Sequence, residues 1–84
     1  MSTTGYEQTT ISSGSTVTVN RGSRMNTVWV LVESGTVRVR ADGSAPTSTV
    51  GELLGQDFSQ GYSASSVQVL ASGGPATIQT WSAK

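Results

Sequence analysis

Few side chains in this sequence can carry out chemistry, and their spacing limits what they can do. The carboxylates are Glu7, Glu33, Asp42, Glu52 and Asp57. Two carboxylates held about 5–9 Å apart can hydrolyse a glycosidic bond, and Glu52 and Asp57 are the pair closest in the sequence outside a hairpin turn. Asp57 is also the kind of residue that caps a turn, and Asp42-Gly43 is itself a turn signal. We therefore expect no acid–base catalysis from these groups.

The other reactive groups are equally restricted. The sequence contains no histidine and no cysteine, so it lacks the base of a Ser-His triad and the usual ligands of zinc. Serines are numerous, but the one lysine, Lys84, is terminal and leaves them without a base. The glycine-rich segments 55–61 and 73–75 lack the Lys-Ser/Thr pair of a phosphate-binding loop and indicate turns. We predict a protein that is not an enzyme and that binds no metal or cofactor.

Charge and hydropathy exclude further classes of function. Five basic and five acidic side chains cancel, and only 12% of the 84 residues are charged, so the chain lacks the basic surface that binds phosphate backbones. Its longest apolar run, Val28–Val32, is far shorter than the ~20 residues of a membrane span. Residues 1–14 are polar and contain no lysine or arginine, unlike a signal peptide. We expect neither a nucleic acid nor a membrane as a partner.

The elements that must position the remaining side chains are β-strands. Short alternating stretches rich in Val and Thr, separated by Gly, Ser, Asn and Asp, are typical of strands. They lie at Thr16–Asn20, Thr27–Glu33, Thr36–Ala41, Thr49–Leu54, Ser66–Leu70 and Thr77–Trp81. Their close spacing predicts an all-β fold, a small antiparallel sandwich or barrel. The expected organisation is a single β domain over residues 15–84, preceded by an extended N-terminal arm over residues 1–14.

The segment around Ser34-Gly35 predicts a β-hairpin with a two-residue turn. The register that follows pairs Val28 with Ala41, Val30 with Val39, and Val32 with Val37. These side chains form one continuous apolar stripe on one face of the hairpin. On the other face Trp29 lies beside Arg40, as a candidate cation–π pair. Glu33 lies diagonal to Arg38 on that same face.

Large apolar side chains on this second face indicate a contact surface. Trp29 and Leu31 would lie on the side that faces water, beside Arg38 and Arg40. Tryptophan and arginine are over-represented in protein interfaces. Either these residues belong to an interface, or a second sheet covers the hairpin so that both of its faces are buried.

The N-terminal arm has little to hold it to its own domain. Residues 1–14 are mainly Ser, Thr, Gly and Gln, with Tyr6 and Ile11 as apolar anchors. Such segments order when they lie against another surface, and a domain of this size without disulfides has a marginal core. We expect self-association with the arm on a neighbouring subunit, and we expect removal of the arm to leave the domain folded.

With the hairpin in place, the order of elements resembles the cupin-type jelly rolls. The strand–Gly–strand stretch Thr27–Gly43 is followed by the turn Val50–Phe58, and Ser66–Leu70 with Ala76–Trp81 would form the closing hairpin. The resemblance implies a jelly roll over roughly residues 15–81. Cupins hold a metal with histidines and a glutamate, but segment 21–26 has no histidine where ligands would stand. The implied fold is therefore carried over and the implied chemistry is not.

In size, composition and architecture the chain also resembles the decoration or cement proteins of tailed-phage capsids. That resemblance implies a virion structural protein on the capsid surface. Its partners would be copies of itself, as a homotrimer, and a larger shell such as a major capsid protein, held by many weak contacts. The interface residues are Tyr6, Ile11, Trp29, Leu31, Arg38, Arg40 and Trp81.

Two alternative functions stay open. A small carbohydrate- or receptor-binding β module, such as a tail or fibre tip, would use Trp29, Tyr62 or Trp81 as a stacking platform. A degenerate cupin-like enzyme would instead bind a transition metal.

Overall fold

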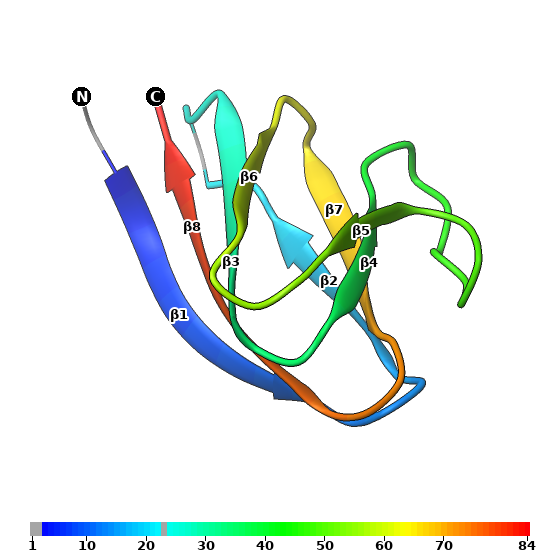
Figure 1. Cartoon of the computed structure of the whole chain (residues 1–84). Helices are drawn as coiled ribbons and strands as arrows, with labels where there is room; N and C mark the ends of the chain where they lie inside the picture. Colours follow the sequence, from blue (N-terminus) through cyan, green and yellow to red (C-terminus); the bar gives the residue numbers. More distant parts are fainter. Residues whose placement is uncertain (1–2, 23) are drawn as a thin grey trace.

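The computed structural model describes residues 3–22 and 24–84, whose eight strands form two antiparallel sheets packed face to face (Figure 1). The strands are β1 (Thr3–Ile11), β2 (Thr16–Asn20), β3 (Thr27–Ser34), β4 (Val37–Arg40), β5 (Glu52–Leu54), β6 (Ser59–Tyr62), β7 (Ser66–Ala71) and β8 (Ala76–Ala83). The first sheet has the order β1-β8-β3-β6, and the second has the order β2-β7-β4-β5. This described part of the chain has no helix of the length and apolar character that crossing a bilayer requires.

Alternating valines form the inner faces of both sheets. In β3, Val28, Val30 and Val32 are fully buried while the residues between them are only partly covered. Val37 and Val39 repeat the pattern in β4. β-branched side chains fit a pleated surface that is buried on one side. The two apolar faces pack into one core, which is completed by Ile11, Leu54, Val67, Val69, Ala71, Ala76 and Ile78.

The strand pairing is nested. β4 pairs with β5, β3 with β6, β2 with β7 and β1 with β8, so the chain folds back on itself as one long hairpin. The β3–β8 and β4–β7 pairs then complete the two sheets. This arrangement of eight strands is the jelly roll. The predicted all-β, jelly-roll-like antiparallel sandwich is confirmed.

The hairpin predicted at Ser34-Gly35 is wrong. β3 pairs with β8 and β6, whereas β4 pairs with β7 and β5, so the turn leads from one sheet to the other. The predicted closing hairpin of segments 66–70 and 76–81 is wrong as well, because β7 and β8 lie in different sheets. Alternation specifies which side of a strand is buried. It does not specify the neighbouring strand, because two facing sheets need the same pattern as one hairpin.

Gly35 allows the chain to cross between the sheets. Its φ of +84° lies in the left-handed region that favours glycine. A Cβ at this position would lie 2.6 Å from the carbonyl oxygen of Pro75 and 3.0 Å from Cα of Ala76. The turn therefore packs directly on the backbone that enters β8.

The sequence patterns do not predict β1 or β6. β1 lies within the residues expected to form an arm, and it pairs antiparallel with β8 from Thr3 opposite Ala83 to Ile11 opposite Ala76. Ile11 is buried in the core of its own chain, with 1% of its surface exposed. In the single chain this segment is therefore the edge strand of the first sheet. Contact between this segment and a neighbouring subunit stays a prediction.

Candidate binding surface

The outer face of the first sheet carries a row of stacked aromatic rings. Trp81 on β8 lies opposite Trp29 on β3, and their ring centroids are 6.1 Å apart with planes 5° apart. Tyr6 on β1 stacks on Trp81 from the other side, at 5.5 Å and 17°. Side chains alternate across a strand, so the rings point outward because their neighbours Val28, Val30 and Thr80 point inward.

Gly61 on β6 ends this row. It lies opposite Trp29 in the sheet, and a Cβ at Gly61 would come within 2.9 Å of Cε2 of the indole. The Trp29 ring therefore rests on the backbone of Gly61 and is half-buried. At the other end Tyr6 is 64% exposed. The stack consequently has its open end at Tyr6, on the edge strand.

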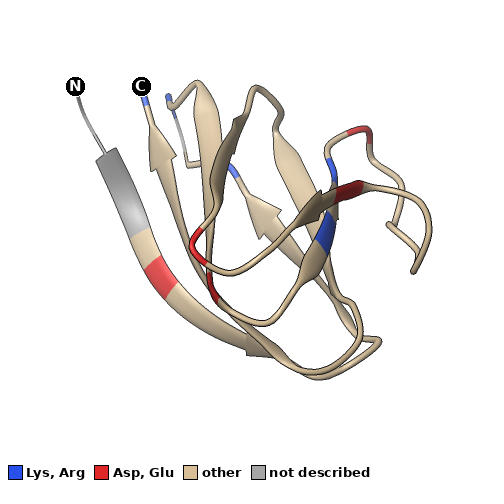
Figure 2. Ribbon diagram, in the orientation of Figure 1, with Lys and Arg blue, Asp and Glu red and all other residues tan. Residues whose placement is uncertain are grey.

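A neutral row runs beside the aromatic one on the same face. Leu31 lies between Gln79 of β8 and Ser59 of β6, and Gln8 of β1 lies opposite Gln79. Gln8 donates a 2.8 Å hydrogen bond from Nε2 to Oε1 of Glu33. Glu33 is the sole charged residue among the outward-facing described residues of these strands. Figure 2 shows no charged residue along β8 or β6.

The structure brings together four of the predicted interface residues, which we call the aromatic face: Tyr6, Trp29, Leu31 and Trp81. The other three lie elsewhere. Ile11 is in the core, and Arg38 and Arg40 are on β4 in the second sheet. The proposed Trp29–Arg40 and Glu33–Arg38 pairs are wrong, since β3 and β4 belong to different sheets.

Arg38 and Arg40 hold the loop between β4 and β5. Arg38 donates from Nη1 to the carbonyl oxygen of Gly51 at 3.0 Å. Arg40 forms an ion pair with Asp42, in which Nε donates to Oδ1 at 3.1 Å. The hydrogen bond from Arg40, reinforced by the backbone N–H of Ser44, lowers the pKa of Asp42 below its usual value. Both arginines therefore bind within their own chain.

The carboxylate pair closest in sequence also has structural contacts. Glu52 accepts a 2.5 Å hydrogen bond from the hydroxyl of Tyr62. Burial, together with this bond to a carboxylate, raises the pKa of Tyr62 above its usual range. Asp57 lies in a turn, as predicted, where its N–H donates to the carbonyl oxygen of Val32 at 2.8 Å. Tyr62 pairs with the buried Val28 and is not part of the aromatic row.

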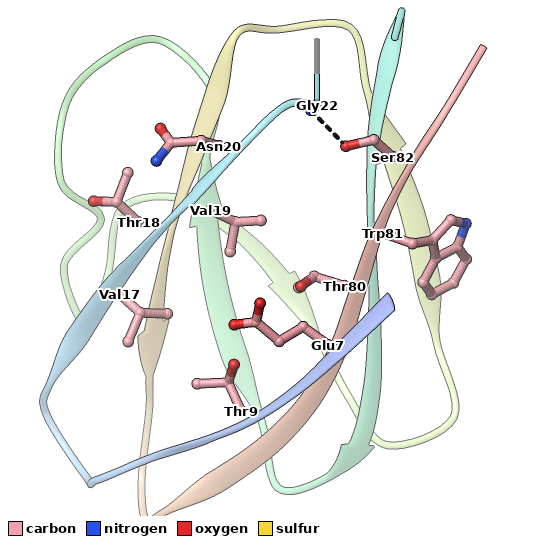
Figure 3. Close-up of a pocket in the computed structure, with 10 residues that line it drawn as sticks. All are labelled: Glu7, Thr9, Val17, Thr18, Val19, Asn20, Gly22, Thr80, Trp81 and Ser82. Atoms are coloured by element: carbon pink, nitrogen blue, oxygen red, sulfur yellow. Dashed lines mark hydrogen bonds between the residues drawn. The ribbon is translucent and has the colours of Figure 1, made fainter. Parts of the chain in front are cut away.

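A pocket of about 450 Å³ opens between the sheets, on the side where β1 and β2 separate (Figure 3). Glu7 of β1 and Thr80 of β8 line it from the first sheet, and Val17 and Val19 line it from the second. Among the described residues that line it, Glu7 has the one ionisable side chain. Its wall is closed in part by the N–H of Gly22, which donates to Oγ of Ser82 at 2.9 Å. Within the described ranges, no group of three His, Cys, Asp or Glu residues is placed to hold a metal ion.

Comparison with known proteins supports the fold. No family model and no curated protein matches the sequence. Among solved structures, the chain is similar to the cupin_2 domain of an XRE family transcriptional regulator from Enterobacter cloacae. The TM-score is 0.67 at 14% identity, over 92% of this chain and 77% of the other. Likeness at this identity concerns the fold alone, and it confirms that the chain folds as a cupin-like jelly roll.

Proposed function

We propose that this chain is a non-enzymatic structural protein that assembles with further copies of itself and adheres to a larger protein shell through the aromatic face. The resemblance to capsid cement proteins implies one such case, in which the chain decorates a phage capsid on the virion surface and a major capsid protein is its partner. The observation that carries the proposal is the stacked row of Tyr6, Trp81 and Trp29 on an outer face with a single charged residue.

The physical argument rests on preorganisation. Aromatic side chains supply a large contact area at a low cost in side-chain entropy. Trp29 and Trp81 are held further by stacking on each other, and Trp29 also rests on Gly61. Little freedom is therefore lost when a partner covers the two rings. Leu31 extends the apolar area into the neighbouring row. A rigid, nearly uncharged patch of this kind favours contact with another protein surface.

The distribution of the carboxylates supports a non-enzymatic role. Glu52 is bound by Tyr62, Glu33 by Gln8 and Asp42 by Arg40. Each of these groups serves a contact within the fold. In the pocket between the sheets, Glu7 lies among hydroxyl, aliphatic, amide and indole side chains. The described lining residues include no second ionisable group to share a proton transfer.

Substitution of Leu31 tests the proposed function. Leu31→Lys places a charge in the middle of the aromatic face, and Leu53→Lys makes the same change at a 55%-exposed leucine of the second sheet. Each variant is mixed with virus particles purified from the strain that encodes the chain, and the particles are sedimented. We expect wild type and Leu53→Lys to sediment with the particles and Leu31→Lys to stay in the supernatant. Equal behaviour of the two variants, or no co-sedimentation of wild type, would contradict the proposal.

A carbohydrate-binding role is the second candidate, favoured by the exposed ring of Tyr6 beside the carboxamides of Gln8 and Gln79. A sugar stacks on an aromatic ring while its hydroxyls bond to neighbouring amides. A glycan array with wild type, Tyr6→Ala and Phe58→Ala separates the two functions, since Phe58 is equally exposed and lies outside the face. Saturable binding that only Tyr6→Ala loses would favour this candidate over shell adhesion.

A further inference from the structure

We propose that β1 is a docking edge for β1 of a second copy, so that two chains join about a twofold axis and their first sheets become one continuous sheet. The inference rests on the self-association in the proposed function. It adds that the contact surface is the edge of β1, that the partner is the same edge of a second copy, and that the two are related by a twofold axis. A symmetric pairing of this edge gives a dimer in place of the trimer expected from the resemblance.

The edge itself is long and has few of the features that protect an edge strand. β1 has nine residues, whereas the other edge strands, β2, β5 and β6, have five, three and four. An edge strand leaves a row of N–H and C=O groups free to pair with another chain. Proteins usually protect such edges with lysine, proline, β-bulges or covering loops. The sequence of β1 contains no lysine, arginine or proline. A shift of register between Thr4 and Glu7, next to Tyr6, interrupts the pairing of β1 with β8, and the pairing from Glu7 to Ile11 is regular.

Tyr6 indicates that the partner is the same edge of another copy. The ring row runs from Gly61 through Trp29 and Trp81 to Tyr6, which is 64% exposed at its open end. In a twofold pairing, a residue at the axis meets its own counterpart. Tyr6 would then stack on Tyr6 of the second copy, because aromatic rings on paired strands attract one another. The two rows would join into one across the axis.

Charge favours the same register. Glu7 is the only charged residue of β1, and like charges directly opposite each other destabilise a strand pair. A pairing centred on Tyr6 keeps the two Glu7 carboxylates out of direct opposition, whereas a pairing centred on Glu7 places them face to face. The pocket between the sheets also opens beside β1, so the same second copy would cover its mouth.

The molecular mass in solution is the first test. Sedimentation equilibrium of the full chain over a wide concentration range should give twice the 8.7 kDa of one chain. Tyr6→Lys brings two positive charges together at the axis and should give a single-chain mass. Phe58→Lys, at an aromatic residue that is 66% exposed and outside β1, should keep the double mass. A wild type of single or triple mass, or a Tyr6→Lys variant of double mass, would overturn the inference.

A crosslink keeps the test decisive if Tyr6→Lys does not fold. The chain has no cysteine, so Tyr6→Cys introduces the single thiol of each copy at the proposed axis, where strand pairing brings the two within disulfide range. Mild oxidation should join the copies much faster than in Phe58→Cys, and equal rates would overturn the inference. If wild type is a single chain that still sediments with virus particles, the edge pairing fails while adhesion through the aromatic face stands.

Discussion

At the scale of single residues, Glu52 and Tyr62 form the contact that ties the two sheets together at the side opposite β1. Glu52 starts β5 in the second sheet and Tyr62 ends β6 in the first. Their hydrogen bond therefore holds together two edge strands that share no backbone ladder. A phenol that donates to a carboxylate favours its protonated form, which links this contact to stability at high pH.

The pKa of Tyr62 should lie well above the usual 10.0. Burial is the larger cause, and the hydrogen bond to the negatively charged Glu52 is the smaller one. In a Tyr6→Phe background Tyr62 is the only tyrosine, so its ultraviolet absorbance reports the titration. Glu52→Gln removes the negative charge and should bring the pKa of Tyr62 closer to 10.0 while the contribution of burial remains. Titration near 10.0 in both proteins would show that the phenol is free in solution.

The same pair should make stability depend on pH in the alkaline range. Because the pKa of Tyr62 is raised in the folded state, its contribution is fully present below pH 10 and is lost as pH rises through the folded pKa. Tyr62→Phe should lower the free energy of unfolding by about 1 kcal/mol at neutral pH. In urea titrations that difference from wild type should shrink above pH 10. A constant difference across this range would contradict the linkage.

At the scale of elements, the turn at Gly35 decides which sheet β4 joins. Gly35 and Gly14 have similar φ values, +84° and +79°, but only Gly35 has backbone atoms where a Cβ would lie. Gly14→Ala should therefore cost about 1 kcal/mol of unfolding free energy for the left-handed backbone alone. Gly35→Ala adds a collision with the carbonyl oxygen of Pro75 and should cost about 2–4 kcal/mol. Equal costs in urea denaturation would mean that the turn relaxes freely.

Most strands that can be predicted from the sequence, such as β2, β3 and β7, have a valine at every second position on the side that faces the core. β8 has Ile78 and Thr80 at these positions instead. β2 has the predicted bounds, Thr16–Asn20, and β3, β7 and β8 extend their predicted ranges by one to three residues. β1 and β6 lack this pattern: β1 buries Ile11 near its end, and β6 is Ser59–Tyr62 with a glycine inside it. Their strand state comes from pairing with β8 and β3, which local sequence does not encode.

The candidate site shows the same division. The sequence predicts that some of these side chains point outward, because they alternate with the buried residues of their strands. They are Trp29, Leu31 and Trp81. Their meeting on one face does not follow, because Trp81 and Trp29 are 52 positions apart (81 minus 29) and meet only in the β3–β8 pair. Arg38 and Arg40 do not lie on this face, because β4 belongs to the second sheet and does not pair with β3. Gly61 lies in segment 55–61, whose glycines indicate turns, so its place under the ring of Trp29 does not follow from the sequence.

At the scale of the whole molecule, the nested pairing leads us to expect that the fold requires its first strand. β8 lies between β1 and β3 in the first sheet, so β1 covers the outer edge of β8. Ile11 of β1 fills part of the common core. Removing the segment would uncover the ladder of β8 along its length and open the core. Composition indicates that the domain folds without residues 1–14, whereas the pairing of β1 and the burial of Ile11 lead us to expect that it does not.

A chain without residues 1–14 should be largely unfolded. Emptying the site of Ile11 alone costs about 2–4 kcal/mol, against a total stability of about 5–10 kcal/mol for a domain of this size. The amide NMR spectrum of the truncated chain should lose the dispersion of β-sheet structure. Ile11→Val, which keeps the strand and removes one methylene, should cost only about 1 kcal/mol and stay folded. A dispersed spectrum from the truncated chain would return the segment to the role of a dispensable arm.

The stacking of Trp29 on Trp81 has a practical consequence. The chain has two tryptophans, and both lie in this one row. Indole emission from the protein therefore originates entirely at the aromatic face, and its wavelength responds to anything that displaces water from that face. Nearly parallel rings at 6.1 Å also couple their electronic transitions. The surface proposed to bind a partner is thus an intrinsic optical probe of its own occupancy, with no label to attach.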